Sequence, residues 1–160
     1  MTRPTLRLLL SHPAHFISLG FGAGLSPRGP GTCGTLVAWL FYPLLRTPVS
    51  DPVFLALLVS FFVAGVISTD RTGRALGVSD HGGIVWDEIV AFWLVLFFTP
   101  TGLAWQALAF VLFRFFDIVK PQPIRLADSR VKGGFGVMLD DLIAAGYAIL
   151  ALAVLKHFLG

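Results

Sequence analysis

Charged residues are scarce in this chain. Of its 160 residues only 13% are Asp, Glu, Lys or Arg, whereas 56% are hydrophobic and the mean hydropathy is +0.81. An ordinary soluble domain carries about 25% charged residues. So few polar side chains could not cover the surface of a soluble domain of this size. We therefore expect lipid to cover the excess apolar surface.

Markers of several other protein classes are missing too. The net charge is only +3 and the basic residues form no continuous stripe, which speaks against nucleic acid as a partner. The single cysteine, Cys33, cannot form an internal disulfide and lies far from the histidines that a familiar zinc pattern needs. The N-terminal apolar run at 8–10 is too short for a secretory signal and favours a short interfacial helix.

Uncharged stretches divide the chain into about five apolar segments: 29–45, 52–69, the two parts of 89–113, and 142–155. The Thr-Pro-Thr-Gly sequence at 99–102 is typical of a tight turn between helices. We expect short apolar helices with interfacial loops or helices, in a single domain over residues 1–160. None of the segments reaches the roughly 20 apolar residues of a comfortable span. Either the helices continue through their charged flanks, or the 89–113 pair is re-entrant.

Lysine and arginine are distributed unevenly between the two sides that alternating segments would create. Ten of them fall in the N-terminus and in the 70–88 and 114–141 loops, against two on the other side. Because basic loops stay in the cytoplasm, we expect a multi-pass protein with these three parts on the cytoplasmic side. Eight of the nine acids lie on that side as well, although acids influence topology little. Their clustering therefore needs another cause.

A glycine-rich segment at 20–35 is the first candidate for chemistry. Glycines allow backbone N–H groups to approach an anion, and a loop that leads into a helix N-terminus favours phosphate. No Gly-Lys-Ser/Thr follows, so this is not a Walker loop. The alternative is a turn-rich connection capped by Thr32 or Thr35. The side chains that could add donors are Ser26, Arg28, Thr32 and Thr35.

Asp87 and Glu88 stand immediately before an apolar helical run. Acids are favoured in a first turn by the helix dipole, but two of them at the edge of a membrane helix are costly without a cation. Successive helical residues point about 100° apart, so one could bind metal while the other takes a second role. Nearby His81 is either a ligand or a turn residue.

A third polar segment contains Arg114, Asp117 and Lys120, which share one helix face and could also form an intrahelical ion-pair ladder. Asp140 and Asp141 then open the last apolar run. Carboxylates at the cytoplasmic ends of three helices would repel one another without a cation, and oxygen-only ligands suit Mg²⁺. Lys120, Arg125 and Arg28 would complement a substrate phosphate. The five carboxylates are Asp87, Glu88, Asp117, Asp140 and Asp141.

These motifs, in this order and over nearly the whole chain, resemble the phosphatidylglycerophosphatase A family. The resemblance implies an all-α, membrane-embedded helical bundle in the bacterial inner membrane. It also implies a Mg²⁺-dependent phosphatase that converts phosphatidylglycerophosphate into phosphatidylglycerol. The chain departs from the family at Ala91 and Ala145, where glycine is frequent. The residues that carry the likeness are Gly22–Pro27, Pro30–Thr35, Asp80-His81, Trp86–Glu88, Phe113–Ile124 and Gly133–Asp141.

We expect Asp87 or Glu88, with Asp140 or Asp141, to bind the metal, and a remaining carboxylate to act as general base. The loop of the cysteine phosphatases is absent, because Trp39 stands six residues after Cys33 where an arginine is required. An aspartate nucleophile on another scaffold stays open. The rival function is a small ion channel or transporter with an acidic cluster at its cytoplasmic face, although such proteins place ionisable groups near mid-membrane.

Overall fold

The computed structural model describes the backbone of residues 3–159 and the side chains of 3–126 and 130–158. Within these residues the chain forms helices and no strand, which confirms the all-α fold class. The elements are α1 (Leu6–Ser11), α2 (Pro13–Ser18), the 3₁₀ segment η1 (Gly20–Leu25), α3 (Pro30–Arg46), α4 (Asp51–Leu76), α5 (Trp86–Phe98), α6 (Leu103–Val119), α7 (Ile124–Arg130) and α8 (Gly133–Leu159).

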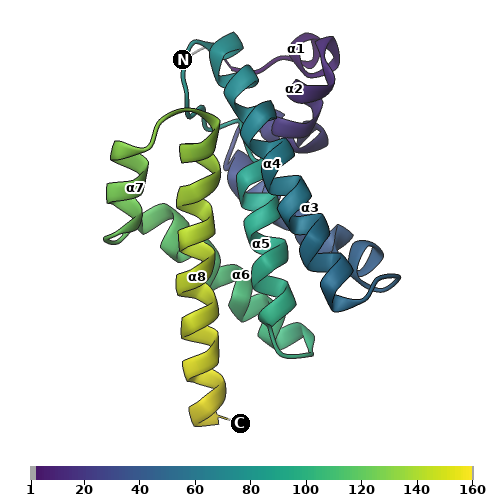
Figure 1. Ribbon diagram of the computed structural model, residues 1–160, viewed down its shortest axis with the longest axis vertical. Helices are drawn as coiled ribbons and strands as arrows, with labels where there is room; N and C mark the ends of the chain where they lie inside the picture. Colours follow the sequence, from purple (N-terminus) through teal and green to yellow (C-terminus); the bar gives the residue numbers. More distant parts are fainter. Residues whose placement is uncertain (1–2, 160) are drawn as a thin grey trace.

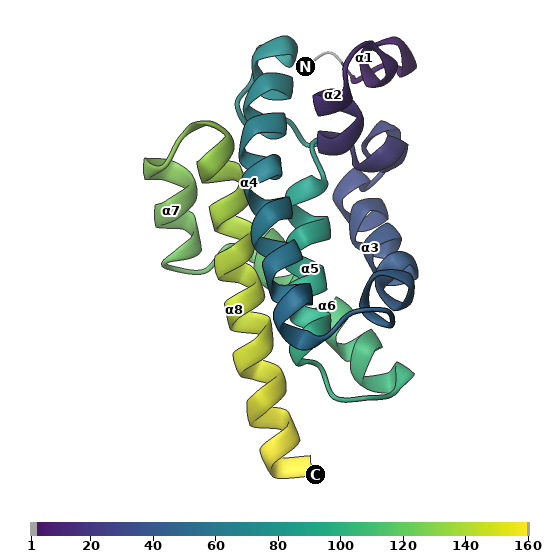
Figure 2. The same ribbon diagram turned by 45° about the vertical axis from the view of Figure 1, so that its right-hand side comes forward.

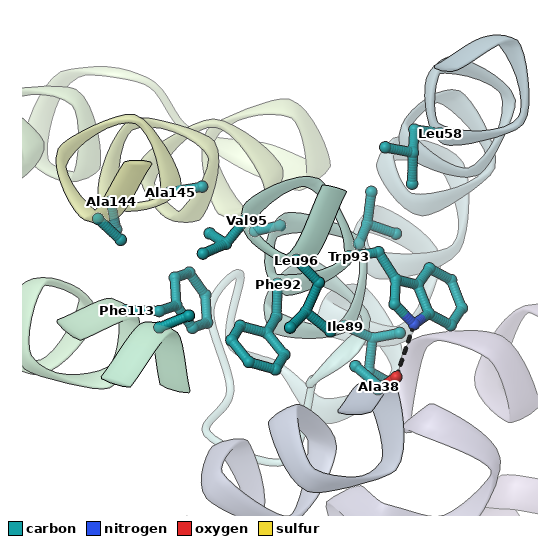
Figure 3. Close-up of a cluster of buried hydrophobic side chains, with 14 of the residues drawn as sticks. Ala38, Leu58, Ile89, Phe92, Trp93, Val95, Leu96, Phe113, Ala144 and Ala145 are labelled. Carbon is teal, nitrogen blue, oxygen red and sulfur yellow. Dashed lines mark hydrogen bonds between the residues drawn. The ribbon is translucent and has the colours of Figure 1, made fainter. Parts of the chain in front are cut away.

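Helix α5 lies at the centre of the bundle. After Asp87 and Glu88 its sequence is apolar on every side, and a helix of this kind is stable only when it is surrounded. It packs against α3, α4, α6 and α8. Figure 3 shows Phe92 and Trp93 of α5 pointing toward neighbouring helices, and Trp93 Nε1 donates a hydrogen bond of 2.8 Å to the Ala38 carbonyl of α3. This central helix fixes where its two acids lie.

Two of the apolar helices are longer than the sequence predicted. Helix α4 has 26 residues, and α8 runs for 27 along the bundle until its last turns project beyond it (Figures 1 and 2). Among the described residues these two are long and apolar enough to cross a membrane, by length and composition. Both continue through charged residues, Asp70 in α4 and Asp140 in α8, because a charge at the polar end of a helix does not interrupt its backbone hydrogen bonds.

Helices α5 and α6 form the expected antiparallel hairpin, joined at 99–102. With 13 and 17 residues they are about 20 and 26 Å long, which is less than the ~30 Å of a bilayer's hydrocarbon core. The C-terminal end of α6 and the N-terminal ends of α3 and α5 meet at one end of the bundle, together with the first turns of α8. Residues from all four helices line one cavity there.

The outer faces of α3, α4 and α6 carry large exposed apolar side chains. Leu40 is 73% exposed, Ile67 65% and Ile118 70%. Soluble monomers rarely expose apolar surface so extensively.

The two positions that depart from the family pattern, Ala91 and Ala145, are buried in the core, so their methyl groups are accommodated between packed helices.

Candidate metal centre

All five predicted carboxylates line a single cavity of about 350 Å³: Asp87 and Glu88 from α5, Asp117 from α6, and Asp140 and Asp141 from α8. The structure thus brings together residues that are more than 50 positions apart in the chain. Asp87, Asp140 and Asp141 are each at least 93% buried, their relative exposures being 7%, 3% and 3%.

Local structure explains how α5 delivers its acids. The helix begins at Trp86, after Val85, whose N–H donates a hydrogen bond of 2.9 Å to the Ser18 carbonyl at the end of α2. Val85 and Ile89 are completely buried, so the first turn cannot rotate. Asp87 and Glu88, which lie between these two anchors, are held at the cavity.

Three of the carboxylates form a tight cluster. One carboxylate oxygen from each of Asp87, Glu88 and Asp141 lies within 4.8 Å of the other two. The buried oxygens Asp87 Oδ1, Glu88 Oε2 and Asp141 Oδ2 have no hydrogen-bond partner. Burying a neutral polar group without a partner costs about 2–7 kcal/mol, and burying an ionised carboxylate without one costs more. The cluster therefore calls for a cation.

The acids of α5 are electrostatically strained as they stand. Burial, and after it the Glu88 carboxylate, raises the pKa of Asp87 well above its ordinary value. Burial also raises the pKa of Glu88 to about 7; nearby Asp117 adds to this, while a hydrogen bond with Asp87 and the charge of Arg114 work against it. A divalent cation would remove this penalty. The donor set consists only of carboxylate oxygens, which fits Mg²⁺ rather than a structural zinc ion.

Two basic side chains hold the remaining carboxylates. Arg114 Nη1 lies 2.5 Å from Asp117 Oδ2 and 3.5 Å from Glu88 Oε1. Lys120 Nζ lies 2.5 Å from Asp140 Oδ2 on α8. The intrahelical ladder suggested by the spacing therefore forms only between Arg114 and Asp117, since Lys120 reaches another helix. Asp140, which we also expected as a metal ligand, lies outside the cluster of three.

The predicted substrate-binding residues are divided between several places. Lys120 lines the acidic cavity. Ser26 and His81 line a neighbouring cavity of about 310 Å³, which shares Pro30 and Gly82 with the acidic one. His81 Nδ1 accepts a 3.0 Å hydrogen bond from the Gly83 N–H, as a turn residue does.

The other four predicted donors do not line the acidic cavity. The Thr35 hydroxyl is buried and donates to the Gly31 carbonyl within α3 at 2.9 Å. Thr32 is half-buried, and Arg28 and Arg125 are exposed. The glycine-rich segment instead contributes its backbone, because Gly29, Pro30 and Gly31 form part of the cavity wall.

Eight lining residues were not among the predicted site residues: Gly29, Pro30, Gly31, Asp80, Gly82, Ile84, Arg114 and Ile118. A Cβ at Gly31 would overlap Glu88 Oε1 and lie 3.1 Å from both terminal nitrogens of Arg114. Arg114 could have been found from its position directly after the apolar run 107–113, because a charge there needs a buried partner. The glycine-rich segment 20–35 was predicted as a whole, but nothing in the sequence singled out Gly31, since its close approach depends on a side chain 57 positions away.

Comparisons with known proteins identify relatives over nearly the whole chain. The chain is 39% identical to the phosphatidylglycerophosphatase A of Haemophilus influenzae over 98% of this chain and 96% of the relative. It is 40% identical to the phosphatidylglycerophosphatase A of Escherichia coli K12 over 96% and 87%. A Bacteroides thetaiotaomicron protein, provisionally named a phosphatidylinositol-3-phosphatase, is 38% identical over 90% and 94%.

No solved structure matches the chain. The profile of the family described as phosphatidylglycerophosphatase A matches residues 16–156. That range contains every carboxylate of the cavity, together with Arg114 and Lys120. The chain therefore belongs to the phosphatidylglycerophosphatase A family of phosphatases.

Proposed function

We propose that this protein hydrolyses the terminal phosphomonoester of phosphatidylglycerophosphate, with Mg²⁺ held in the acidic cavity, and releases phosphatidylglycerol and inorganic phosphate. The observation that carries the proposal is the cluster of Asp87, Glu88 and Asp141, whose buried oxygens lack partners and lie within 4.8 Å of one another. The names of the Haemophilus and Escherichia relatives supply the substrate.

The proposed location is the bacterial inner membrane, with the cavity at the cytoplasmic face. The lengths of α4 and α8 support membrane insertion, and the ten-to-two distribution of basic residues supports this orientation. The relatives with this family name are bacterial. In this arrangement the head group lies in the polar cavity while the acyl chains stay in the bilayer.

In the mechanism, Asp87, Glu88 and Asp141 would hold the ion. When bound, Mg²⁺ supplies Lewis-acid stabilisation of the negative charge on the phosphoryl oxygens. Lys120 and Arg114 border the same cavity and complement the phosphate charge. Helix α3 begins at the cavity wall, so its first N–H groups and the positive end of its dipole are available to the phosphate.

A carboxylate outside the cluster accepts the proton of the attacking water. Three cavity carboxylates lie outside the cluster, Asp80, Asp117 and Asp140. Asp117 and Asp140, which are close to Arg114 and Lys120, are the candidates we propose for this role. General-base catalysis of this kind contributes about 10²–10⁴-fold to the rate. Comparing Asp117→Asn with Asp140→Asn identifies which of the two is the base, because each change removes the charge and preserves the shape of the side chain.

The proposal is tested by measuring phosphate release from phosphatidylglycerophosphate in mixed micelles. We expect release in Mg²⁺, loss with a chelator and recovery when Mg²⁺ is restored. Asp87→Asn, Glu88→Gln and Asp141→Asn should each reduce kcat strongly, whereas Asp51→Asn, at an exposed acid paired with Arg46, should not. Release that is insensitive to the chelator would exclude the metal role. No release under any condition would exclude the substrate.

Phosphatidylinositol 3-phosphate is the appropriate competing substrate in the same assay, because of the name of the Bacteroides relative. A higher kcat/KM for the inositol lipid would reassign the head group while leaving the metal centre unchanged. An ion channel or transporter, the rival that the sequence left open, does not fit a member of a phosphatase family.

A further inference from the structure

Helices α3 and α6 both pack against α5, run antiparallel to each other, and contact each other through long side chains. At one level, a Cβ on Gly31 would be 3.1 Å from the Arg114 guanidinium nitrogens. At a second level, Trp39 Nε1 donates a 2.8 Å hydrogen bond to Gln106 Oε1. In both helices the two levels are eight residues apart, or about 12 Å along the helix axis. Side chains therefore bridge the pair at both levels.

An apolar groove lies along the part of this pair that is farther from the acidic cavity. It has a volume of about 350 Å³ and is lined by Leu36, Trp39, Leu40 and Pro43 of α3 and by Gln106 of α6. The α3 residues recur at a helical spacing of three and four, which places them on one face. The only polar side-chain groups in this lining belong to Trp39 and Gln106, and the Trp39 N–H and the Gln106 oxygen bond each other.

The other end of the pair, with the start of α3 and the end of α6, borders the acidic cavity. Gly29–Gly31 of α3 and Arg114, Asp117 and Ile118 of α6 belong to its lining. Ile118 is 70% exposed, so an outward-facing apolar side chain forms part of the wall of a polar cavity. One pair of helices thus offers charged groups at one end and an open apolar surface at the other.

Trp39, which lines the α3–α6 groove, is held by other aromatic rings. The Trp39 and Phe110 rings stack with centroids 5.7 Å apart, and Phe92 of α5 lies edge-on to both. Figure 3 shows Phe92 between Phe113 of α6 and Ala38 of α3. The packed rings keep the Trp39 side chain in place, and its indole offers an acyl chain apolar contact area while its N–H is already bonded to Gln106.

We propose that the α3–α6 groove holds an acyl chain of the lipid substrate while the terminal phosphate lies in the acidic cavity, so that the lipid reaches the site sideways from the bilayer between α3 and α6. This inference rests on the proposed function. A diacyl phospholipid is the occupant because it joins a phosphate to an apolar chain, and this is the order of charge and apolar surface along the helix pair.

The bundle contains a matched control. A second apolar cavity, of about 260 Å³, is lined by Leu55, Leu58, Val59, Phe62, Val90, Leu94 and Leu142. None of these residues belongs to α3 or α6, and none lines the acidic cavity. Val59 is 64% exposed and Leu40 73%, so each can be replaced by tryptophan without disturbing the core. Leu40→Trp fills the α3–α6 groove, and Val59→Trp fills the other cavity.

The experiment compares kcat/KM for diacyl phosphatidylglycerophosphate with kcat/KM for its water-soluble deacylated head group. In Leu40→Trp the ratio of these two values should fall at least about tenfold, which is about 1.4 kcal/mol. Val59→Trp should keep the wild-type ratio. An unchanged ratio in Leu40→Trp overturns the proposal, and so does an equal change in Val59→Trp. If the wild-type protein releases phosphate from neither substrate, the proposed function itself has failed.

A direct measurement covers the case in which Leu40→Trp does not fold. Wild-type protein is irradiated with diacyl phosphatidylglycerophosphate that carries a photoreactive group in one chain, and the labelled peptides are mapped. Labels on α3 and α6 near Leu36, Leu40 and Gln106 are expected. Labels confined to the cavity of α4, α5 and α8 would overturn the inference.

Discussion

Lys120 Nζ, at the C-terminal cap of α6, lies 2.5 Å from Asp140 Oδ2 on α8. Lys120 has a left-handed backbone with φ 45°, a conformation that costs a non-glycine residue about 1–3 kcal/mol. The helix ends here because Pro121 cannot continue it. The ion pair ties the end of α6 to α8 beside the carboxylate cluster, so the strain accompanies a functional position.

The Lys120–Asp140 pair should show energetic coupling. Replacing either residue by alanine removes this ion pair and keeps one of its charges, whereas the double variant removes both charges. We expect a coupling free energy of roughly 0.5–3 kcal/mol in a double-mutant cycle. Unfolding in mild detergent, followed by circular dichroism, measures it. Additive effects of the two changes would show that the pair contributes nothing to stability.

The carboxylate cluster should make the protein less stable without metal than an amide variant. In Asp141→Asn one of three mutually repelling buried groups becomes neutral at nearly constant shape, so the melting temperature in chelator should rise above that of the wild type while activity falls. Mg²⁺ at 100 times its Kd should stabilise the wild type by about 2.7 kcal/mol and the variant by less. Thermal melts with chelator and with Mg²⁺ check both. Equal Mg²⁺ stabilisation of the two proteins would contradict the assignment.

Gly31 should be intolerant of even a methyl group. Gly31→Ala places a Cβ against Glu88 Oε1 and the Arg114 guanidinium, so kcat/KM should fall at least about tenfold, or about 1.4 kcal/mol in the activation free energy. Gly146→Ala on α8 is the control, because nothing lies within 4 Å of its added Cβ and alanine favours a helix. Activity assays on both variants decide the matter, and wild-type activity in Gly31→Ala would refute the prediction.

Acid should loosen the contact between α2 and α4. His15 Nδ1 lies 2.8 Å from Thr72 Oγ1, which is itself 2.5 Å from Ser18 Oγ. Burial, and after it the charges of His12 and Arg71, lowers the pKa of His15 below 6.5. The unfolded chain therefore binds the proton more readily, so this stabilisation is complete above pH 6.5 and is lost as the pH falls below that value.

The prediction is checked by measuring the melting temperature between pH 8 and pH 5 at constant ionic strength. His15→Gln should flatten the acid side of the profile, because it removes the titrating group. His157→Gln, at an exposed histidine near the C-terminus, should leave the profile unchanged. A wild-type profile in His15→Gln would assign the pH dependence to other groups.

Much of the bundle could be predicted from local features. The scarcity of charge predicted the apolar helices, and the Thr-Pro-Thr-Gly motif predicted the turn between α5 and α6. Local signals were weaker for helix ends. Helices α4 and α8 continue through Asp70 and Asp140, since a charged side chain at a polar helix end leaves the backbone hydrogen bonds intact.

The sequence by itself determined which residue types were available for chemistry, because acids and bases at the ends of apolar segments stand out without any structure. Only the tertiary structure decided how they are used. It joins Asp141 to Asp87 and Glu88, turns Lys120 toward Asp140, and brings the bare backbone of Gly31 against Glu88. The reason is geometric: spacing along a helix gives the angle between its own side chains, whereas the rotation of one helix against another depends on how their apolar faces pack.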